Sequence, residues 1–205
     1  MDREELTDDQ VLAAVAGVSL ITPDRLRNLL AAVRRTDGLP GDMAELGVYR
    51  GGSARVIAHA RPDTTLHLFD TFAGLPYTEA LYHNPTGHDL SKGRFACDRG
   101  AVETFLHGCK VVIHEGLFPE SAWGIAGLRF SFVHVDCDLY VSARDAIAWL
   151  WRRMVLGGIM FFDDYGCDFT GVTDAVDEAF HSSAIEKQRE ASNGITIGCL
   201  VVKRG

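Results

Sequence analysis

The chain has 205 residues, 47% of them hydrophobic and 23% charged, which is typical of one soluble globular domain. Twenty basic against 28 acidic residues give a net charge of −8, which argues against a nucleic-acid-binding protein. The five cysteines form no C-x-x-C pair, so neither a disulfide scaffold nor a zinc ribbon is expected. Neither a signal peptide nor a run of about 18 apolar residues is found, so we expect a cytoplasmic protein without membrane contact.

Two helices are predicted first, over residues 8–19 and 23–35, the second with Thr22 as its N-cap and Pro23 as its first residue. Strands and helices alternate from there on. The expected strands are 43–48, 65–69, 111–113, 130–135, 157–162, 184–190 and 194–202. The expected helices are 53–60, 99–107, 140–154 and 171–182. This alternation predicts an α/β fold whose seven-stranded sheet is mostly parallel, has helices on both faces and ends in an antiparallel hairpin turning at Ser192-Asn-Gly194.

We expect a single domain over residues 1–205, with the N-terminal helices in 1–40. Residues 77–97 show no clear period and are long for a connection in a compact domain, so they are predicted to form an acceptor-side loop or lid. Four side chains of this loop are candidate substrate contacts: Tyr77, Tyr82, His83 and His88. The alternative is that its histidines are simply exposed to solvent.

A glycine-containing turn, Glu45-Leu-Gly-Val-Tyr-Arg-Gly-Gly-Ser53, joins the first strand to the next helix. Gly47 and Gly51 would let backbone N–H groups approach a ligand closely. Three larger residues separate these glycines, so the turn departs from G-x-G-x-x-G. This departure favours a cofactor that has no phosphate at this point. Glu45 would repel a phosphate but suits the cationic end of an amino acid. The alternative is a tight turn that binds nothing.

Asp70 lies 23 residues after Gly47, at the end of the next strand. A carboxylate at this position can accept hydrogen bonds from both hydroxyls of a ribose. The alternative is that Asp70 is an N-cap. Together the turn and Asp70 predict an adenosine-containing ligand, either NAD or S-adenosylmethionine (SAM).

Three aspartates follow two of the predicted strands, Asp136 after 130–135 and Asp163-Asp164 after 157–162. If these strands are neighbours, their ends lie about 4.8 Å apart. The three carboxylates would then converge, which is costly unless a cation neutralises them. Oxygen ligands favour Mg²⁺ or Ca²⁺ over zinc. Cys137 is offset by one residue and is expected to face away, and the alternative for the aspartates is that they cap the following helices.

Four segments together resemble the macrocin-type O-methyltransferases, metal-dependent SAM enzymes that modify sugars in antibiotic biosynthesis. They are Glu45-Leu-Gly-Val-Tyr-Arg-Gly-Gly, Leu68-Phe-Asp-Thr-Phe-Ala-Gly-Leu-Pro76, His134-Val-Asp-Cys-Asp-Leu-Tyr140 and Gly157-Gly-Ile-Met-Phe-Phe-Asp-Asp-Tyr-Gly166. The similarity extends over roughly residues 20–200. It implies the Rossmann-like fold of class I SAM methyltransferases.

The resemblance also implies roles for individual residues. SAM would be bound by Glu45, Gly47, Val48, Tyr49, Gly51, Ser53, Asp70, Thr71, Phe72, Gly116 and Phe118. Residues 45–53 would hold its methionine end, Asp70 its ribose, and Gly116 and Phe118 would lie near its adenine. Mg²⁺ or another divalent cation would be bound by Asp136, Asp163 and Asp164, with Asp136 also the catalytic base. Tyr49 and Tyr165 join the loop residues as candidate substrate contacts.

Mg²⁺ held by three carboxylates keeps about three of its six positions free, which favours a small-molecule acceptor with adjacent oxygens. The family resemblance implies that this acceptor is a sugar or a glycosylated natural product. A homodimer is a further expectation from the family. A catechol-type methyltransferase acting on an aromatic diol would use the same fold and metal. Two remoter alternatives are a glycosyltransferase that uses Asp136-Cys-Asp138 as a D-x-D motif, and a non-catalytic SAM-binding module.

Overall fold

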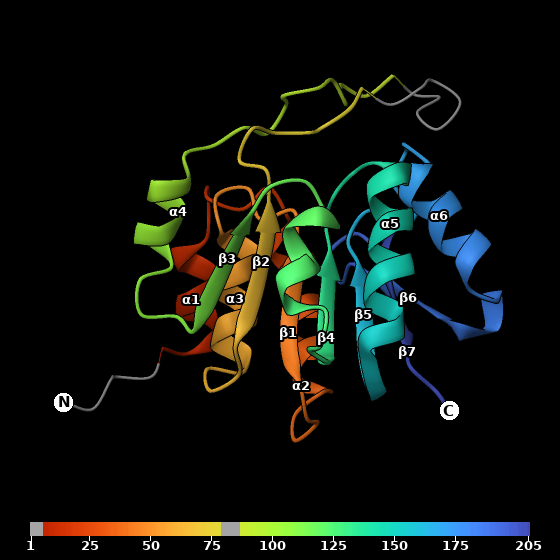
Figure 1. Cartoon of the computed structure of the whole chain (residues 1–205), viewed down its shortest axis with the longest axis horizontal. Helices are drawn as coiled ribbons and strands as arrows, with labels where there is room; N and C mark the ends of the chain where they lie inside the picture. The colour runs from red at the N-terminus through yellow and green to blue at the C-terminus, as the bar shows by residue number, and fades with distance from the viewer. Residues whose placement is uncertain (1–5, 79–86) are drawn as a thin grey trace.

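The computed structural model describes residues 6–78 and 87–205, and its centre is a seven-stranded sheet with the order β3-β2-β1-β4-β5-β7-β6 (Figure 1). The strands are β1 (Asp42–Leu46), β2 (Leu66–Asp70), β3 (Val111–Glu115), β4 (Phe130–Val135), β5 (Met154–Phe162), β6 (Ile185–Arg189) and β7 (Thr196–Val202). The α-helices are α1 (Asp8–Ala14), α2 (Pro23–Arg34), α3 (Gly52–Ala60), α4 (Arg99–Phe105), α5 (Tyr140–Leu150) and α6 (Gly171–Ala179). Three short 3₁₀ helices are η1 (Glu120–Ile125), η2 (Trp151–Arg153) and η3 (Ser182–Ala184).

The sheet has the predicted mixed topology. The first five strands pair in parallel, whereas β7 pairs antiparallel with both β5 and β6. The order of the strands reverses between β1 and β4, where the chain crosses from one half of the sheet to the other. Every residue of β4 is buried, as expected for a central parallel strand covered on both faces. The predicted α/β class and the antiparallel hairpin are therefore confirmed.

Three predicted helices end at least three residues early in the structure. The helix expected over 8–19 ends at Ala14, and the following turn includes Gly17, whose φ is +77°. The helix expected over 140–154 ends at Leu150, because Met154 already pairs with Phe130 of β4. The helix expected over 171–182 ends at Ala179, because Phe180 adopts an extended conformation.

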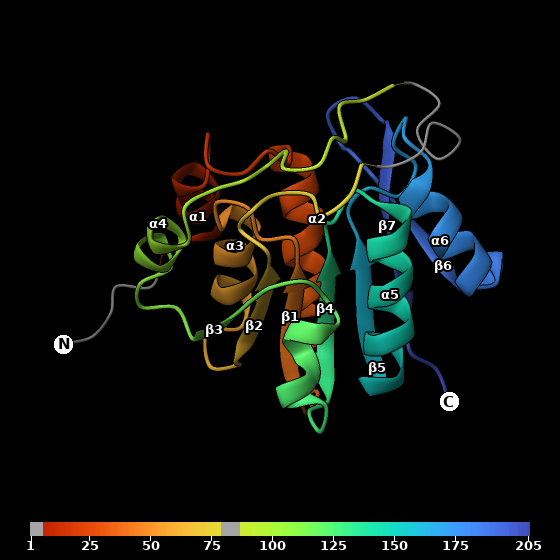
Figure 2. The same ribbon diagram turned by 45° about the horizontal axis from the view of Figure 1, so that its top comes forward.

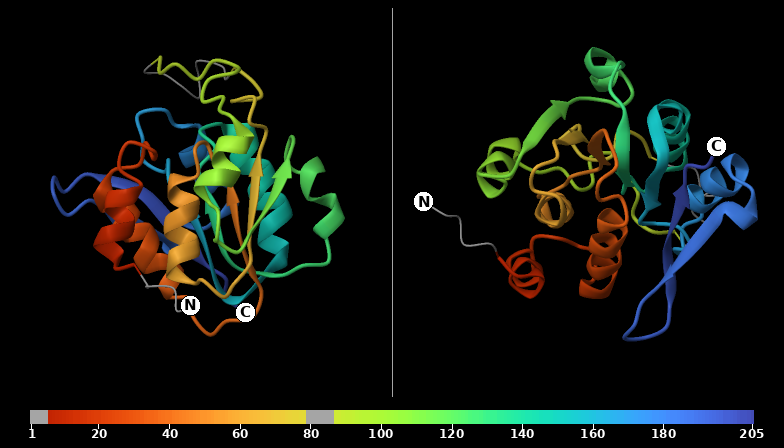
Figure 3. Two further views of the ribbon diagram at one scale, coloured as in Figure 1. Left: turned by 90° about the vertical axis from the view of Figure 1, so that its left-hand side faces the viewer. Right: turned by 90° about the horizontal axis from the view of Figure 1, so that it is seen from below.

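Helices cover both faces of the sheet and produce two apolar cores (Figures 2 and 3). One core includes buried side chains of α1, α2, α3 and α4, and the other those of η1, α5 and α6. Alternation along β1 divides its residues between them, since Met43 belongs to the first core and Ala44 and Leu46 to the second. The carboxyl ends of the parallel strands are left at one edge between the two layers, where ligands of such sheets bind.

The start of α2 is fixed to the turn that joins β6 to β7. Thr22 caps the helix and donates from its hydroxyl to Glu190 Oε1 at 2.8 Å. The backbone N–H of Ser192 donates to Asp24 Oδ2 at 2.8 Å. These contacts hold the first turn of α2, and with it Arg25, beside the carboxyl end of the sheet.

The connection between β2 and α4 runs over the carboxyl ends of the strands in its described parts, residues 71–78 and 87–98 (Figure 1). Leu75 and Leu90 from this connection pack with Leu139, which follows β4. In residues 6–78 and 87–205, the helices are all too short or too polar to traverse a lipid bilayer. All five cysteines are free thiols, as predicted.

Candidate functional site

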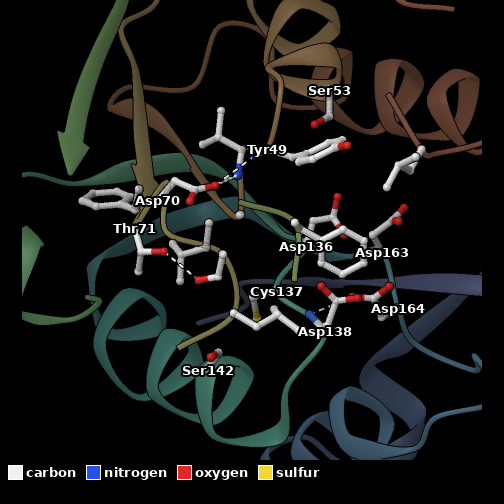
Figure 4. A pocket seen from close by; sticks show the side chains of 18 of the residues that line it. Tyr49, Ser53, Asp70, Thr71, Asp136, Cys137, Asp138, Ser142, Asp163 and Asp164 are labelled. Carbon is white, nitrogen blue, oxygen red and sulfur yellow. Dashed lines mark hydrogen bonds between the residues drawn. The ribbon is translucent and has the colours of Figure 1, made fainter. Parts of the chain in front are cut away.

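A cavity of about 280 Å³ opens at the carboxyl ends of the parallel strands (Figure 4). Its wall combines residues that follow β1, β2, β3, β4 and β5 with the start of α2 and the segment Val18–Ile21. Eight of the predicted cofactor-binding residues line it: Gly47, Val48, Tyr49, Ser53, Asp70, Thr71, Gly116 and Phe118. The topology therefore brings together segments that lie up to about 150 residues apart in the sequence.

The turn after β1 needs glycine at position 47. Gly47 has a φ of +79°, and a Cβ built on it would lie only 1.7 Å from the backbone oxygen of Asp136. Gly52, which the sequence analysis did not single out, also lines the cavity, and a Cβ there would lie 2.6 Å from Cβ of Ser19. These two positions let the turn approach both the end of β4 and the segment before α2.

Asp70 ties this turn to the end of β2. Its Oδ2 accepts hydrogen bonds from the backbone N–H groups of Val48 and Tyr49 at 2.7 and 2.9 Å. Its Oδ1 accepts from the N–H of Phe72 at 2.7 Å. An ionised carboxylate offers about four lone-pair positions, so it retains capacity for a ligand hydroxyl. Asp70 thus lines the cavity as predicted, and most of its hydrogen bonding shapes the wall itself.

Three predicted cofactor residues lie outside the cavity lining. Glu45 is fully buried within the sheet layer, where its Oε1 lies 2.8 Å from Nδ1 of His134 on the adjacent strand. Gly51 is the N-cap of α3 and faces side chains of α4. Phe72 is buried in the first apolar core. The interpretation of Glu45 as a partner for a cationic amino-acid end is therefore wrong for this cavity, because strand alternation directs its side chain into the core.

The three predicted metal ligands do converge. Val135 and Phe162 are paired neighbours, and one carboxylate oxygen from each of Asp136, Asp163 and Asp164 lies within 4.8 Å of the others. Burial raises the pKa of Asp136 and Asp164 well above the ordinary value, and the negative charge of Asp163 raises both further. The surroundings therefore favour the protonated form of these two carboxyls over the ionised form. Three oxygen donors at this spacing fit a hard divalent cation such as Mg²⁺.

A fourth acid, Asp138, lies beside these three (Figure 4); from the sequence it was named only in the D-x-D alternative and not among the expected ligands. Its φ is +58°, uncommon for a residue other than glycine, and its N–H donates to Asp164 Oδ2 at 3.1 Å. Burial and the charge of Asp163 raise the pKa of its carboxyl to about 7. Strand alternation does not apply here because the chain has left β4. Cys137, expected to face away, also lines the cavity but is not one of the three converging groups.

One cationic side chain, Arg25, enters the acidic cluster from α2. Its Nη2 donates to the backbone oxygen of Asp163 at 3.0 Å and forms an ion pair with the Asp163 carboxylate. No local pattern points to this role, because Arg25 lies on an ordinary amphipathic helix and its partner is 138 residues away. Arg25 and the four acids together form the polar side of the cavity.

Of the candidate substrate residues that the structure describes, some line the cavity and others lie outside its lining. Tyr49 lines the cavity, where its ring packs edge-on against Phe95 with the centroids 6.0 Å apart. Tyr77 is exposed outside the lining, and the ring of His88 packs edge-on against Phe169, a lining residue, with the centroids 5.5 Å apart. The prediction for Tyr165 is wrong: it is buried, and its hydroxyl donates to Asp177 at 2.9 Å. Tyr82 and His83 lie outside the described residues.

Comparison with known proteins gives a consistent result. A family model described as Macrocin-O-methyltransferase (TylF) matches residues 2–189. A relative from Streptomyces olivaceus, 8-demethyl-8-(2,3-dimethoxy-alpha-L-rhamnosyl)-tetracenomycin-C 4'-O-methyltransferase, is 33% identical over 70% of this chain and 61% of its own length. Mycinamicin III 3''-O-methyltransferase from Micromonospora griseorubida is 28% identical over 72% of this chain and 65% of its own length. The chain thus spans less than two thirds of either relative.

Among solved structures, the O-methyltransferase NovP is similar in fold. The two chains superpose with a TM-score of 0.78, over 97% of this chain and 98% of that one, at 23% sequence identity. At this identity the likeness concerns the arrangement of the helices and strands. It agrees with the topology described above.

Proposed function

The chain belongs to the macrocin O-methyltransferase family, and we propose that it transfers a methyl group from SAM to a hydroxyl group of a small-molecule acceptor. The observation that carries this proposal is the position of the acidic cluster, which shares one cavity with the glycine-containing turn and Asp70. A cofactor bound along the turn would present its reactive end to the cluster. The chain thus has a place for both reactants within one cavity.

The cofactor side supports SAM through the turn after β1. Gly47 and Val48 bring the backbone close to the cavity, and Ser53 lies there in the first turn of α3. Asp70 remains our proposed partner of the ribose hydroxyls, and Gly116 and Phe118 our proposed neighbours of the adenine. SAM supplies an electrophilic methyl group on a sulfonium, so the chain's task is to align an acceptor oxygen with it and to exclude water.

The acidic side supports a divalent cation. Asp136, Asp163 and Asp164 would hold it, and when bound it would make an acceptor hydroxyl more acidic. The acceptor's proton must leave as the oxygen–carbon bond forms and the carbon–sulfur bond breaks. Asp136 was predicted to take it. We now propose Asp138, because a carboxylate held by a cation is a weaker base, whereas Asp138 lines the cavity outside the three converging groups.

We propose a sugar or glycosylated natural product with adjacent oxygens as the acceptor. The two named relatives are methyltransferases of tetracenomycin and mycinamicin compounds, and the first name specifies a rhamnosyl group. Apolar side chains of the β2–α4 connection, including Leu75, Pro76 and Phe95, line the same cavity as the acids. They would suit the less polar face of a deoxysugar.

The test is calorimetric titration of SAM with Mg²⁺ and with EDTA, followed by transfer of labelled methyl groups to glycosides and catechols. We expect micromolar SAM binding in both conditions and transfer to a sugar hydroxyl only with Mg²⁺. Transfer to catechols alone would move the acceptor to the aromatic class. Absence of SAM binding in both conditions would overturn the proposed function.

A further inference from the structure

The acidic cluster contains a cationic side chain, the guanidinium of Arg25. The side chain of Arg25 is 14% exposed and that of Asp163 is 3% exposed, so the ion pair is largely withdrawn from solvent. Burial alone would lower the pKa of Arg25, but the charges of Asp163 and Asp164 hold it above the ordinary value. Arg25 therefore stays charged and offsets part of the surplus negative charge at the site.

The guanidinium is only partly engaged. Nη2 makes both contacts to Asp163, whereas the buried Nε has no hydrogen-bond partner among the described residues. A guanidinium that served only to fasten α2 to β5 would gain more from a two-pronged pairing with the carboxylate. The start of α2 also has other anchors, through Thr22 and Asp24. Arg25 is thus not the sole connection between α2 and this end of the sheet.

Arg25 and a divalent cation would require the same group. Asp163 contributes one of the three oxygens that converge, and Arg25 already holds that carboxylate. Two cations cannot share it closely without repulsion in a partly desolvated site. A metal ion at the three oxygens and the guanidinium of Arg25 would therefore compete for the Asp163 carboxylate.

We propose that Arg25 is the internal counter-ion of the acidic cluster, holding Asp163 while the metal is absent and releasing it when a divalent cation binds. This inference rests on the metal site of the proposed function. Arg25 is in this sense a positioning residue, which keeps Asp163 in place and lowers the apparent affinity for the metal. A carboxylate occupied for about nine-tenths of the time would weaken that affinity about tenfold.

The experiment compares wild-type protein with Arg25→Met, which keeps much of the volume of the side chain and removes its charge. Arg27→Met is the matched control, because Arg27 lies on the same helix, is about half exposed, and pairs with Asp24 and Asp9 away from the cavity. Binding of Mn²⁺ and Mg²⁺ alone is measured by calorimetry. Melting temperatures are measured in EDTA and in saturating Mg²⁺.

We expect Arg25→Met to bind the metals about tenfold more tightly than wild type. It should melt lower than wild type in EDTA, because the acids lose their counter-ion, and the difference should shrink in Mg²⁺. Arg27→Met should bind metal as wild type does. If Arg25→Met is not obtained folded, Arg25→Lys replaces it, with about threefold tighter binding expected because a shorter ammonium cannot make both contacts.

Two other outcomes are distinguishable. Unchanged or weaker metal binding in the folded Arg25 variant, with the same loss of melting temperature in both conditions, would make Arg25 a structural connector and overturn this inference alone. If neither wild type nor the Arg25 variant binds metal, the metal-dependent reaction itself fails, and the counter-ion role fails with it. Metal binding by the Arg25 variant but not by wild type would support the inference, because Arg25 would then exclude the metal altogether.

Discussion

The two sides of the cavity differ in how their polar groups are paired. On the cofactor side, Asp70 accepts three backbone N–H groups and Gly47 seats the turn against β4. On the acidic side, four carboxyl groups line the cavity, and Arg25 forms an ion pair with one of them, Asp163. The polar groups of the first side are paired within the chain, whereas the second side gathers acids whose burial raises their pKa. The comparison teaches that one side of a cavity can be closed by its own backbone hydrogen bonds while the other gathers buried carboxyl groups around the ion pair of Arg25 with Asp163.

The largest effect is expected from Asp136→Asn. It removes one of the three converging carboxylates, so turnover should fall about 100-fold or more, because the metal's contribution to the barrier is several kcal/mol. SAM binding should change less than about twofold, since the cofactor side stays paired. Single-turnover methyl transfer and SAM calorimetry measure the two sides separately. Retention of wild-type turnover would remove Asp136 from the reaction.

Asp138→Asn separates the proposed base from the proposed metal ligands on the acidic side. We expect a comparable loss of turnover, because the proposed proton acceptor is gone, with Mn²⁺ affinity kept within about threefold. Asp136→Asn is the matched variant, because it should lose both turnover and Mn²⁺ binding. If Asp138→Asn instead abolished Mn²⁺ binding, Asp138 would be a ligand of the metal and not the base.

Breaking the cofactor side should affect stability as well as binding. Asp70→Asn leaves one oxygen to accept three N–H groups, so we expect a loss of about 1–3 kcal/mol in the free energy of unfolding. SAM affinity should fall about tenfold, with Mn²⁺ affinity unchanged. Asp98, which caps α4 outside the cavity by accepting from Ala101 N–H at 2.6 Å, provides the control. Asp98→Asn should leave SAM binding as it is.

Metal should stabilise the protein by mass action. At about one hundred times the dissociation constant, the gain is about 2.7 kcal/mol, which raises the melting temperature of a domain of this size by several degrees. EDTA should reverse the gain. The same titration of Asp136→Asn should give no shift, and an equal shift in that variant would place the metal elsewhere on the molecule.

The smallest effect on the reaction is expected from Tyr165→Phe. Its hydroxyl donates to Asp177 away from the cavity, so turnover should stay within about twofold of wild type. Stability should fall by about 1 kcal/mol for the lost hydrogen bond. A large loss of turnover would show that Tyr165 acts in the site despite its burial.

The residues that sequence reasoning placed correctly share one physical rule. Asp136, Asp163 and Asp164 each follow a buried parallel strand, and neighbouring strands bring their carboxyl ends together. This rule needs only the positions of the strands, which hydrophobic runs and turn residues indicate. Whether these two strands are neighbours was left open by the sequence, and the observed order of the sheet places β4 beside β5.

The residues that were missed or misplaced depend on tertiary geometry. Arg25 reaches the site only because α2 packs beside the carboxyl end of β5, which no local pattern reveals. Asp138 turns back to the cluster through an unusual backbone conformation, beyond the reach of strand alternation. Glu45 was placed at a ligand because of its charge, but its partner is His134 on a strand that is distant in sequence. Charge alone does not distinguish a core pair from a binding residue.

The position of β7 has a consequence for how the chain acquires its site during synthesis. Since β7 lies between β5 and β6 in the sheet, this strand is synthesised after both of the strands that it pairs with. Asp163 follows β5, and the turn that anchors α2 precedes β7. An emerging chain therefore holds its acids close together before Arg25 has its final support. Such long-range closure is expected to be a late, slow step of folding, during which the edge of β5 is open to unwanted pairing.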